Sequence, residues 1–162
     1  MDKLKGKKIM VWTFMGNTRM YNALRDYGDR ISQIGLFSFK VRATGEIYES
    51  GVAISNMLTY INRYRHIKWL LTVANDGMNS IFRALRDNTN GAQDMFLSEL
   101  VRIMQKYPWC DGVDIDLEKG DGYSTHEAST AMFRNIYNTV KAYDSSKLMN
   151  ICLPGMTSVN GS

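Results

Sequence analysis

Residues 111 to 118, with the sequence DGVDIDLE, carry four acidic side chains in eight positions. Residues two apart in a β-strand point to the same face, so Asp114, Asp116 and Glu118 would share one face and the apolar residues between them the other. If the acidic face lies inside a sheet or barrel, burial and mutual repulsion raise the pKa of at least one carboxyl group. The run therefore predicts a carboxylic acid that stays protonated near neutral pH and can act as a general acid.

Glu118 is the expected proton donor, because it is the last acid of the run and lies at the carboxyl end of the strand, where α/β barrels place their chemistry. Asp116 and Asp114 are expected to tune its charge state. Asp111 has the opposite strand parity and is expected to support the start of the strand. Neither a metal nor a cofactor is expected.

Other interpretations of the acidic run are weaker. A solvated edge strand could carry acids on its wet face, but strand-like and helix-like segments flank the run on both sides and favour a central strand. An EF-hand loop that starts at Asp114 would need glycine at its sixth position and glutamate at its twelfth, where Lys119 and Thr125 stand. Magnesium bound by paired carboxylates is a second metal alternative.

The elements that must position these acids alternate along the chain. Five strand-like runs are rich in apolar, β-branched or aromatic residues, at 7–14, 31–41, 67–75, 109–118 and 147–156. Helix-like segments lie between them at 18–29, 55–66, 80–107 and 124–143, with an interruption expected at Asn90-Gly91 and a turn at Thr44-Gly45. This rhythm predicts a parallel sheet with right-handed crossovers, either doubly wound or a (β/α)8 barrel. A single glycine follows the first strand, so a dinucleotide-binding fingerprint is poorly supported.

The composition is that of a globular domain with enough apolar material for a core, since 44% of the 162 residues are hydrophobic and 22% are charged. The net charge of +4 comes partly from four lysines in the first eight residues, which we interpret as a solubilising terminus and not as a nucleic-acid arm. No later basic cluster is interleaved with aromatic residues, so no nucleic-acid partner is expected. No apolar stretch approaches the roughly 18 residues of a membrane span, so no membrane partner is expected either.

The cysteines and the amino-terminal segment bear on where the protein is made. Cys110 and Cys152 lie in apolar, strand-like runs and are too few for a disulfide framework, so both are expected to be buried free thiols. The first apolar run is short, contains Trp12 and lacks a small-residue cleavage site, which indicates a first strand and not a signal peptide. We therefore expect a protein made in the cytoplasm.

The acidic run resembles the D-x-x-D-x-D-x-E signature of glycoside hydrolase family 18, the chitinases and related endo-N-acetylglucosaminidases. The segment IKWLLTVAN (67–75) resembles the third strand of that family's barrel, and LMNICLPG (148–155) resembles the fifth. The resemblance covers nearly the whole chain, as the first five βα units. It implies the α/β class and a (β/α)8 TIM-barrel architecture that is only partly present, with residues 1–162 as a single, partial catalytic domain.

The resemblance also implies an activity, the retaining hydrolysis of β-1,4-linked N-acetylglucosamine polymers, chitin or peptidoglycan-like, in which the substrate's own acetamido oxygen attacks the anomeric carbon. The residue at the position of Glu118 would protonate the glycosidic oxygen and then activate water. Asp116 would turn toward Glu118 and the acetamido nitrogen, and Asp114 would keep Asp116 in the right charge state. An enzyme of this kind without a signal peptide would suit release by another route to degrade cell walls, as phage or prophage enzymes do.

Several features depart from the family pattern. Where the third strand of the family often carries Ser-x-Gly-Gly, Thr72 keeps the hydroxyl, but Ala74 and Asn75 replace the glycines. Leu117 stands where many chitinases carry tryptophan. A complete barrel needs about 250 residues, and the family's strand-six tyrosine and strand-eight tryptophan have no counterpart here. We therefore expect little or no activity from this chain alone, and self-association through the open edge of the barrel.

Other residues near the predicted strand ends are candidates for contact with a polysaccharide substrate. Trp12 and Phe14 are candidate stacking platforms at the end of the first strand, with core packing as the alternative. Asn75 is a candidate for hydrogen bonding to sugar, with ordinary loop capping as the favoured alternative, and Tyr123 is a candidate for lining the cleft. Gly112, in the acidic run, and Thr72, in the strand-like run before it, are expected to support the structure around the acids.

Two other classes of function stay open alongside hydrolysis. One is a catalytically silent module for carbohydrate binding or assembly on the same barrel, although retention of Glu118 argues against it. The other is a metal-dependent α/β enzyme. Substitution of Glu118 and treatment with a chelator would separate these classes.

Overall fold

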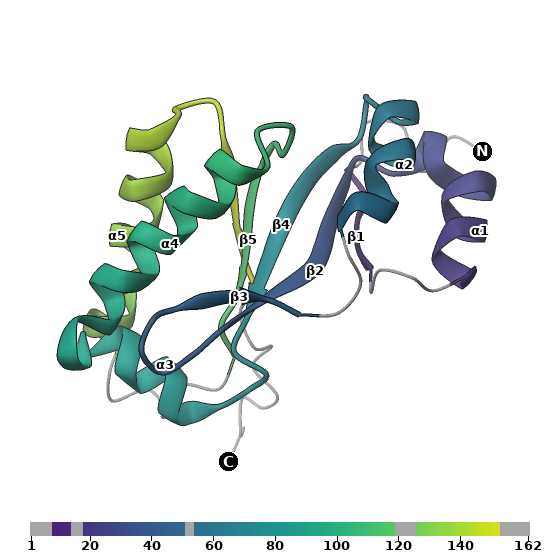
Figure 1. Cartoon of the computed structure of the whole chain (residues 1–162). Helices are drawn as coiled ribbons and strands as arrows, with labels where there is room; N and C mark the ends of the chain where they lie inside the picture. The colour runs from purple at the N-terminus through teal and green to yellow at the C-terminus, as the bar shows by residue number, and fades with distance from the viewer. Residues whose placement is uncertain (1–7, 14–17, 51–53, 119–125, 153–162) are drawn as a thin grey trace, which may run out of the picture.

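Strands and helices alternate along the described part of the chain (Figure 1). The computed structural model describes residues 8–13, 18–50, 54–118 and 126–152. The strands are β1 Met10–Thr13, β2 Gln33–Val41, β3 Ile47–Glu49, β4 Lys68–Ala74, β5 Gly112–Asp116 and β6 Leu148–Ile151. The α-helices are α1 Thr18–Tyr27, α2 Leu58–Arg63, α3 Asn79–Arg86, α4 Ala92–Lys106 and α5 His126–Tyr143, and 3-10 turns lie at Gly28–Arg30, Ile54–Met57 and Thr89–Gly91.

The described strands form one sheet in the order β1-β2-β4-β5-β6, and each neighbouring pair in this order is parallel. Parallel neighbours need a crossover, and at least one α-helix lies in the connection between each pair. The predicted parallel sheet with helical crossovers is therefore confirmed. The acidic strand β5 lies between β4 and β6, so it is a central strand and not an edge.

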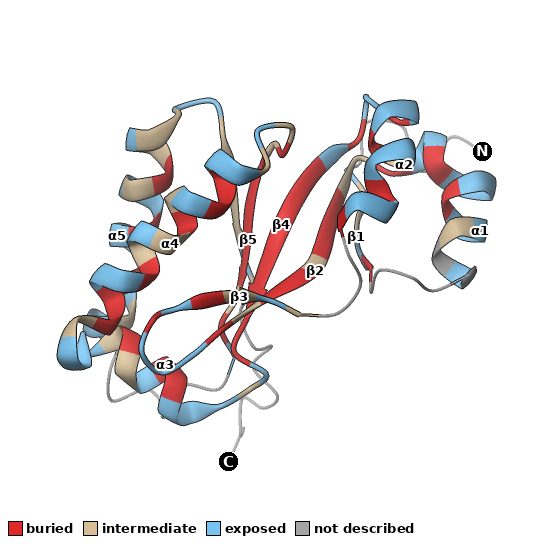
Figure 2. Ribbon diagram, in the orientation of Figure 1, coloured by how far each residue is buried: buried red, intermediate tan, exposed pale blue. Residues whose placement is uncertain are grey.

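The helices cover one face of the sheet. On that face, Leu36, Leu71 and Val113 are register partners in β2, β4 and β5, and all three are fully buried. One hydrophobic cluster joins them to residues from every α-helix, among them Leu24, Ile61, Leu85, Phe96 and Ile136. Figure 2 shows the result as buried colour along β4 and β5, with a buried stripe on each helix that faces the strands. Removal of this apolar surface from water stabilises the sheet and its helices as one unit.

β3 is an element that the sequence pattern did not predict. The turn at Thr44-Gly45 lies where it was expected, and the φ of 86° at Gly45 favours glycine. After the turn, however, the chain pairs antiparallel with the end of β2, with Ile47 opposite Val41. Burial of both side chains in the core accounts for the pairing. A strand of three residues is too short to show an alternating pattern in the sequence.

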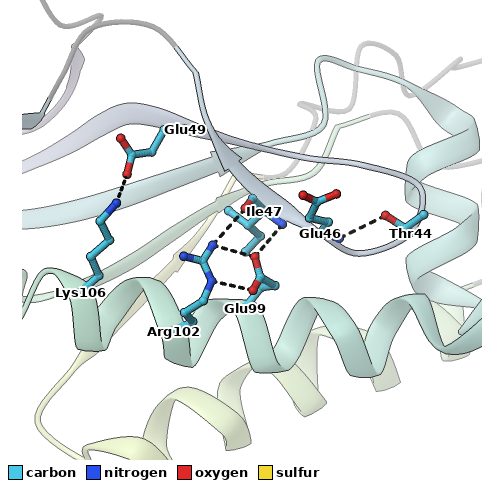
Figure 3. Close-up of polar contacts among 7 residues, drawn as sticks. All are labelled: Thr44, Glu46, Ile47, Glu49, Glu99, Arg102 and Lys106. Atoms are coloured by element: carbon cyan, nitrogen blue, oxygen red, sulfur yellow. Dashed lines mark hydrogen bonds and ion pairs between the residues drawn. The ribbon is translucent and has the colours of Figure 1, made fainter.

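Four charged residues, Glu49, Glu99, Arg102 and Lys106, fix the β2–β3 hairpin to α4 and are called the hairpin clamp below (Figure 3). Glu99 accepts a hydrogen bond of 3.1 Å from the backbone N–H of Ile47, and Arg102 donates one of 3.1 Å to the carbonyl of the same residue. Arg102 pairs with Glu99 at 2.6 Å, and Lys106 pairs with Glu49 at 2.5 Å. The clamp thus supplies partners for backbone groups on the outer edge of β3, which would otherwise be an open strand edge.

The break between α3 and α4 lies where the sequence predicted it. Asn88, Asn90 and Gly91 have positive φ values of 51°, 52° and 78°, which end one helical path and start another. The Oδ1 atom of Asn88 then accepts a hydrogen bond of 2.8 Å from the backbone N–H of Gln93, in the first turn of α4. None of the described helices is long and apolar enough to cross a membrane.

Candidate active site

β5 sends its apolar and acidic side chains to opposite faces, as predicted. Val113 and Ile115, together with Leu117 just after the strand, belong to the core under the helices. Asp114 points to the opposite face, where it meets Trp12 of β1 and Thr72 of β4. This face is called the inner face below.

The three acids of the run differ in exposure. Asp114 is completely buried, Asp116 is half-buried, and Glu118, just beyond the end of the strand, is exposed. Desolvation disfavours a charge most strongly at the buried end of this series and least at the exposed end. The outermost acid, Glu118, is therefore the most open to solvent and to a ligand. Among the described residues, no group of three or more His, Cys, Asp or Glu side chains is arranged to hold a metal ion.

Side chains from three neighbouring segments donate hydrogen bonds to Asp114. The indole N–H of Trp12 and the hydroxyl of Thr72 each donate to Oδ2 at 2.8 Å. The thiol of Cys152, directly after β6, lies 3.7 Å from Oδ1. Hydrogen bonds to the charged form stabilise a buried carboxylate even where no cation is beside it. The network therefore ties β1, β4, β5 and the end of β6 together at one buried group.

The close approach of Trp12 and Thr72 to Asp114 depends on Gly35 in β2. A β-carbon at this position would lie 2.8 Å from Trp12 Cδ1, 2.8 Å from Thr72 Oγ1 and 3.0 Å from Asp114 Oδ2. Packing of this density leaves no room for a methyl group, so alanine would push the network apart. Sequence reasoning missed Gly35, because a glycine inside a strand marks a bulge or a close approach without saying which partner approaches.

The pKa of Asp116 is raised, chiefly by burial and then by the negative charges of Glu118 and Asp114. A hydrogen bond from the Cys152 thiol opposes part of this rise. The sequence predicted a raised pKa for at least one acid of the run, and the structure places it at Asp116. The charge on Asp116 therefore depends on the protonation of both neighbouring acids.

Asn75, a candidate for contact with sugar, is instead used inside the protein. Its side chain is 1% exposed, its amide donates to the carbonyl of Glu118 at 2.9 Å, and its Oδ1 accepts from the N–H of Glu118 at 3.0 Å. The same side chain also bonds the backbone of Gly77 and Met78 in the turn after β4. Protein backbone occupies the whole amide, so the candidate contact with sugar is wrong and the alternative, capping of the loop after β4, is confirmed. Asn75 fixes the backbone of Glu118 from the end of β4.

Asp111 and Gly112 hold the start of β5 between its two neighbours. The Asp111 carboxylate accepts hydrogen bonds from the Lys68 ammonium at 2.7 Å and from the backbone N–H of Trp69 at 2.9 Å, both in β4. On the other side, a β-carbon at Gly112 would lie 1.9 Å from the carbonyl oxygen of Leu148 in β6. Glycine at this position lets β6 approach closely enough to pair.

A hollow of about 620 Å³ lies on the inner face beside Asp114. Its lining includes Trp12 from β1, Gln33 from β2, and Asn150 and Cys152 at β6. Trp12, a candidate stacking platform, is half exposed there while its N–H is engaged by Asp114. Phe14 and Tyr123, two further candidates for contact with sugar, lie outside the described residues.

The two cysteines differ in their surroundings. Both are free, and Cys110 is buried as predicted, but Cys152 is only half-buried, because β6 ends the described strand order and the hollow opens beside it. Sequence reasoning missed the contact between Cys152 and Asp114. That contact follows from the register of β5 and β6, in which Asp114 lies opposite Asn150, and the sequence alone does not fix this register.

Comparisons with known proteins find this fold at low sequence identity. No protein-family model and no curated protein sequence matches the chain. Among solved structures, the spore cortex-lytic enzyme SleL of Bacillus megaterium QM B1551 matches with a TM-score of 0.73 at 18% identity. A chitinase from Bacteroides thetaiotaomicron matches with 0.68 at 18% identity, and the GH18 chitinase ChiB of Flavobacterium johnsoniae with 0.66 at 14% identity.

These matches cover most of this chain but less than half of each of the others. They span 94%, 89% and 93% of this chain, and 35%, 45% and 47% of the SleL, Bacteroides and Flavobacterium chains respectively. At such identities the likeness concerns the fold. The chain has the architecture of part of a TIM-type α/β barrel, which confirms the predicted fold class.

Proposed function

We propose that this chain carries the acidic residues of a glycoside hydrolase that cleaves β-1,4-linked N-acetylglucosamine polymers, chitin or peptidoglycan-like, by the substrate-assisted retaining mechanism. The observation that carries the proposal is the series Asp114, Asp116 and Glu118, which runs from buried to exposed and ends at the carboxyl end of a central parallel strand. This is the end at which α/β barrels place their chemistry. The fold shared with two chitinases supports the same activity.

In this proposal, Glu118 acts first as an acid and then as a base. Its proton passes to the glycosidic oxygen as the bond from that oxygen to the anomeric carbon breaks, while the acetamido oxygen of the same sugar forms a new bond to that carbon. Water then attacks the anomeric carbon as the bond from the acetamido oxygen to that carbon breaks, and the Glu118 carboxylate takes the proton that the water releases. The exposure of Glu118 and the two hydrogen bonds between its backbone and the Asn75 side chain support this role.

Asp116 orients the acetamido group of the substrate, and its own protonation responds to the charge on Glu118. When Glu118 gives up its proton, negative charge grows beside Asp116, whose raised pKa already reflects that neighbour. Asp114 is held in place behind Asp116 by its hydrogen-bond donors and adds to the raised pKa of Asp116. The protonation of Asp116 is therefore coupled to that of Glu118 during the reaction.

Full activity in this proposal needs a more enclosed substrate cleft than the described strands form. β1 and β6 are the two ends of the described strand order, and the hollow beside Asp114 opens between them. Further strands of the same polypeptide, or a second copy of the chain, would have to cover this opening before a sugar could be held on all sides. We therefore propose that the 162-residue chain alone is weakly active or inactive.

The test is hydrolysis of chitooligosaccharides and of purified peptidoglycan strands, measured with the protein as its gene encodes it and with the 162-residue chain. Glu118→Gln keeps the size of the side chain but removes its acid, so we expect hydrolysis to fall by about 10²- to 10⁴-fold. Glu127→Gln, at an exposed glutamate in the first turn of α5, is the matched control and should leave hydrolysis unchanged.

Other outcomes separate the alternative functions. Undiminished hydrolysis by Glu118→Gln would overturn the proposed role of this residue. Binding of the polymers without hydrolysis in any form of the wild-type protein would favour a carbohydrate-binding module. Loss of activity on treatment with a chelator would favour a metal-dependent enzyme.

A further inference from the structure

Cys152 lies where the end of β6 meets the acids of β5. Its backbone N–H donates to the carbonyl of Ile115 at 2.9 Å, so the parallel pairing of β5 and β6 continues to this residue. Its Sγ lies 3.7 Å from Asp114 Oδ1, and the thiol also lowers the pKa of Asp116, the next acid along the strand. One sulfur atom on the wall of the hollow therefore contacts one of the three acids and influences the charge of a second.

The donors of Asp114 are divided between its two oxygens. Oδ2 takes the hydrogen bonds of Trp12 and Thr72, while the thiol approaches Oδ1. A buried carboxylate needs donors on both oxygens to offset its desolvation. The thiol meets this need and, unlike Trp12 and Thr72, also has a second carboxylate within reach.

The surroundings keep this thiol protonated. Burial and then the negative charges of Asp114 and Asp116 raise the pKa of Cys152 to about 12. The charged groups that act on it come from β5, and its described neighbours on β1 and β6, Trp12 and Asn150, carry no charge. A thiol in this state is a hydrogen-bond donor and not a nucleophile.

We propose that Cys152 is a positioning residue of the acidic strand, whose single S–H group donates to Asp114 and can turn to Asp116, and so sets the places of the two carboxylates relative to each other. Any effect of Cys152 on catalysis rests on the proposed function, because the placement of Asp116 affects a reaction only if the protein is a hydrolase of the proposed kind. The hydrogen bonds themselves do not depend on that function and can be measured in the resting protein.

The first test measures the rate at which iodoacetamide alkylates Cys152 at pH 8.5, resolved by peptide mass spectrometry from the buried Cys110. Asp114→Asn removes one charge that disfavours the thiolate, so its pKa should fall and alkylation should accelerate roughly tenfold for each unit of pKa lost. Asp111→Asn is the matched control, because it removes a charge from the same segment that bonds Lys68 and Trp69 instead of the thiol. Equal rates in the two variants would overturn the proposal.

The second test needs no change to the acids. The carboxyl carbon of Asp116 is titrated by NMR in the wild type, in Cys152→Ala and in Cys152→Ser. Alanine removes a donor to the ionised carboxylate, so the pKa of Asp116 should rise further, whereas the serine hydroxyl should return it toward the wild-type value. An Asp116 titration that is the same in all three proteins, or shifted equally by alanine and serine, contradicts the inference.

These readouts separate failure of the inference from failure of the proposed function. If the protein shows no hydrolysis but the alkylation and titration results hold, the placement of the acids by Cys152 stands and the proposed reaction falls. If hydrolysis is found, its pH profile should shift in Cys152→Ala and recover in Cys152→Ser. An unshifted pH profile in Cys152→Ala would show that the thiol does not govern Asp116.

Discussion

Carboxylates in the hairpin clamp and in the acidic strand meet opposite surroundings. In the clamp, hydrogen bonds from Lys106 to Glu49 and from Arg102 to Glu99 lower the pKa of both glutamates. In the acidic strand, burial and the charges of neighbouring acids raise the pKa of Asp116. In the clamp, an ionised carboxylate therefore stabilises the contact between two elements. In the acidic strand, ionisation of Asp116 destabilises the folded state, and the rest of the fold must offset this loss of free energy.

The two regions also differ in what surrounds them. The clamp lies between α4 and the β2–β3 hairpin, where solvent screens its charges, and three of its four side chains are about half exposed. Asp114 is completely buried and has uncharged donors, which fix its position without neutralising its charge. Of these two regions, only the inner face has carboxylates whose negative charges raise the pKa of a neighbouring carboxylic acid.

The largest expected contrast is in stability. Asp114→Ala leaves the buried hydroxyl of Thr72 and the indole N–H of Trp12 without their acceptor, and we expect the free energy of unfolding to fall by about 2–4 kcal/mol, after partial relief of repulsion with Asp116. Glu49→Ala removes an exposed ion pair and should cost about 1 kcal/mol or less. Urea denaturation of both variants measures the difference. Equal losses would show that the network around Asp114 contributes no more than a surface ion pair.

The next contrast is the sign of the pH dependence in the acidic strand. The folded-state pKa of Asp116 is raised above the unfolded value of about 3.9, so its contribution to stability is present below pH 4 and is lost as pH rises through the folded-state pKa. Asp116→Asn should therefore gain stability relative to the wild type as pH rises from 3 to 7. Urea denaturation across this range gives the slope, and a falling difference would contradict the raised pKa.

The clamp should show the opposite slope. The folded-state pKa of Glu49 is lowered, so its contribution is present above the unfolded value of about 4.3 and is lost as pH falls through the folded-state pKa. Glu49→Gln should therefore lose stability relative to the wild type as pH rises from 3 to 5, by less than about 1 kcal/mol because the pair is half exposed. Parallel slopes for Glu49→Gln and Asp116→Asn would erase the distinction between the two regions.

The smallest expected contrast is in the response to salt. Raising the ionic strength to about 0.5 M shortens the screening length to a few ångströms, so most of the loss caused by Glu49→Gln should disappear. The loss caused by Asp114→Ala should stay nearly unchanged, since solvent ions do not reach a buried group. Repeating the urea titrations of both variants in added NaCl checks this. A strong salt effect at Asp114 would mean that the inner face is wetter than its burial indicates.

What the sequence predicts well is what depends on local pattern. The parity of residues 113 to 118, the parallel strands and the break before α4 all follow from periodicity or from the backbone preferences of glycine and asparagine. What it predicts poorly depends on register between distant strands. The contacts of Cys152 and Asn75 with the acidic strand join residues about 40 positions apart, and no local pattern encodes them.

Gly35 contributes no functional group, yet three side chains from three strands meet over the space it leaves empty. A bulkier residue at position 35 would fit only if Trp12 or Thr72 became smaller, because the volume above β2 is shared among them. Positions 12, 35 and 72 should therefore vary together among relatives of this chain, with the summed side-chain volume nearly constant while the acidic signature stays the same. Such covariation would trace the inner face of the barrel in sequences that no longer resemble one another elsewhere.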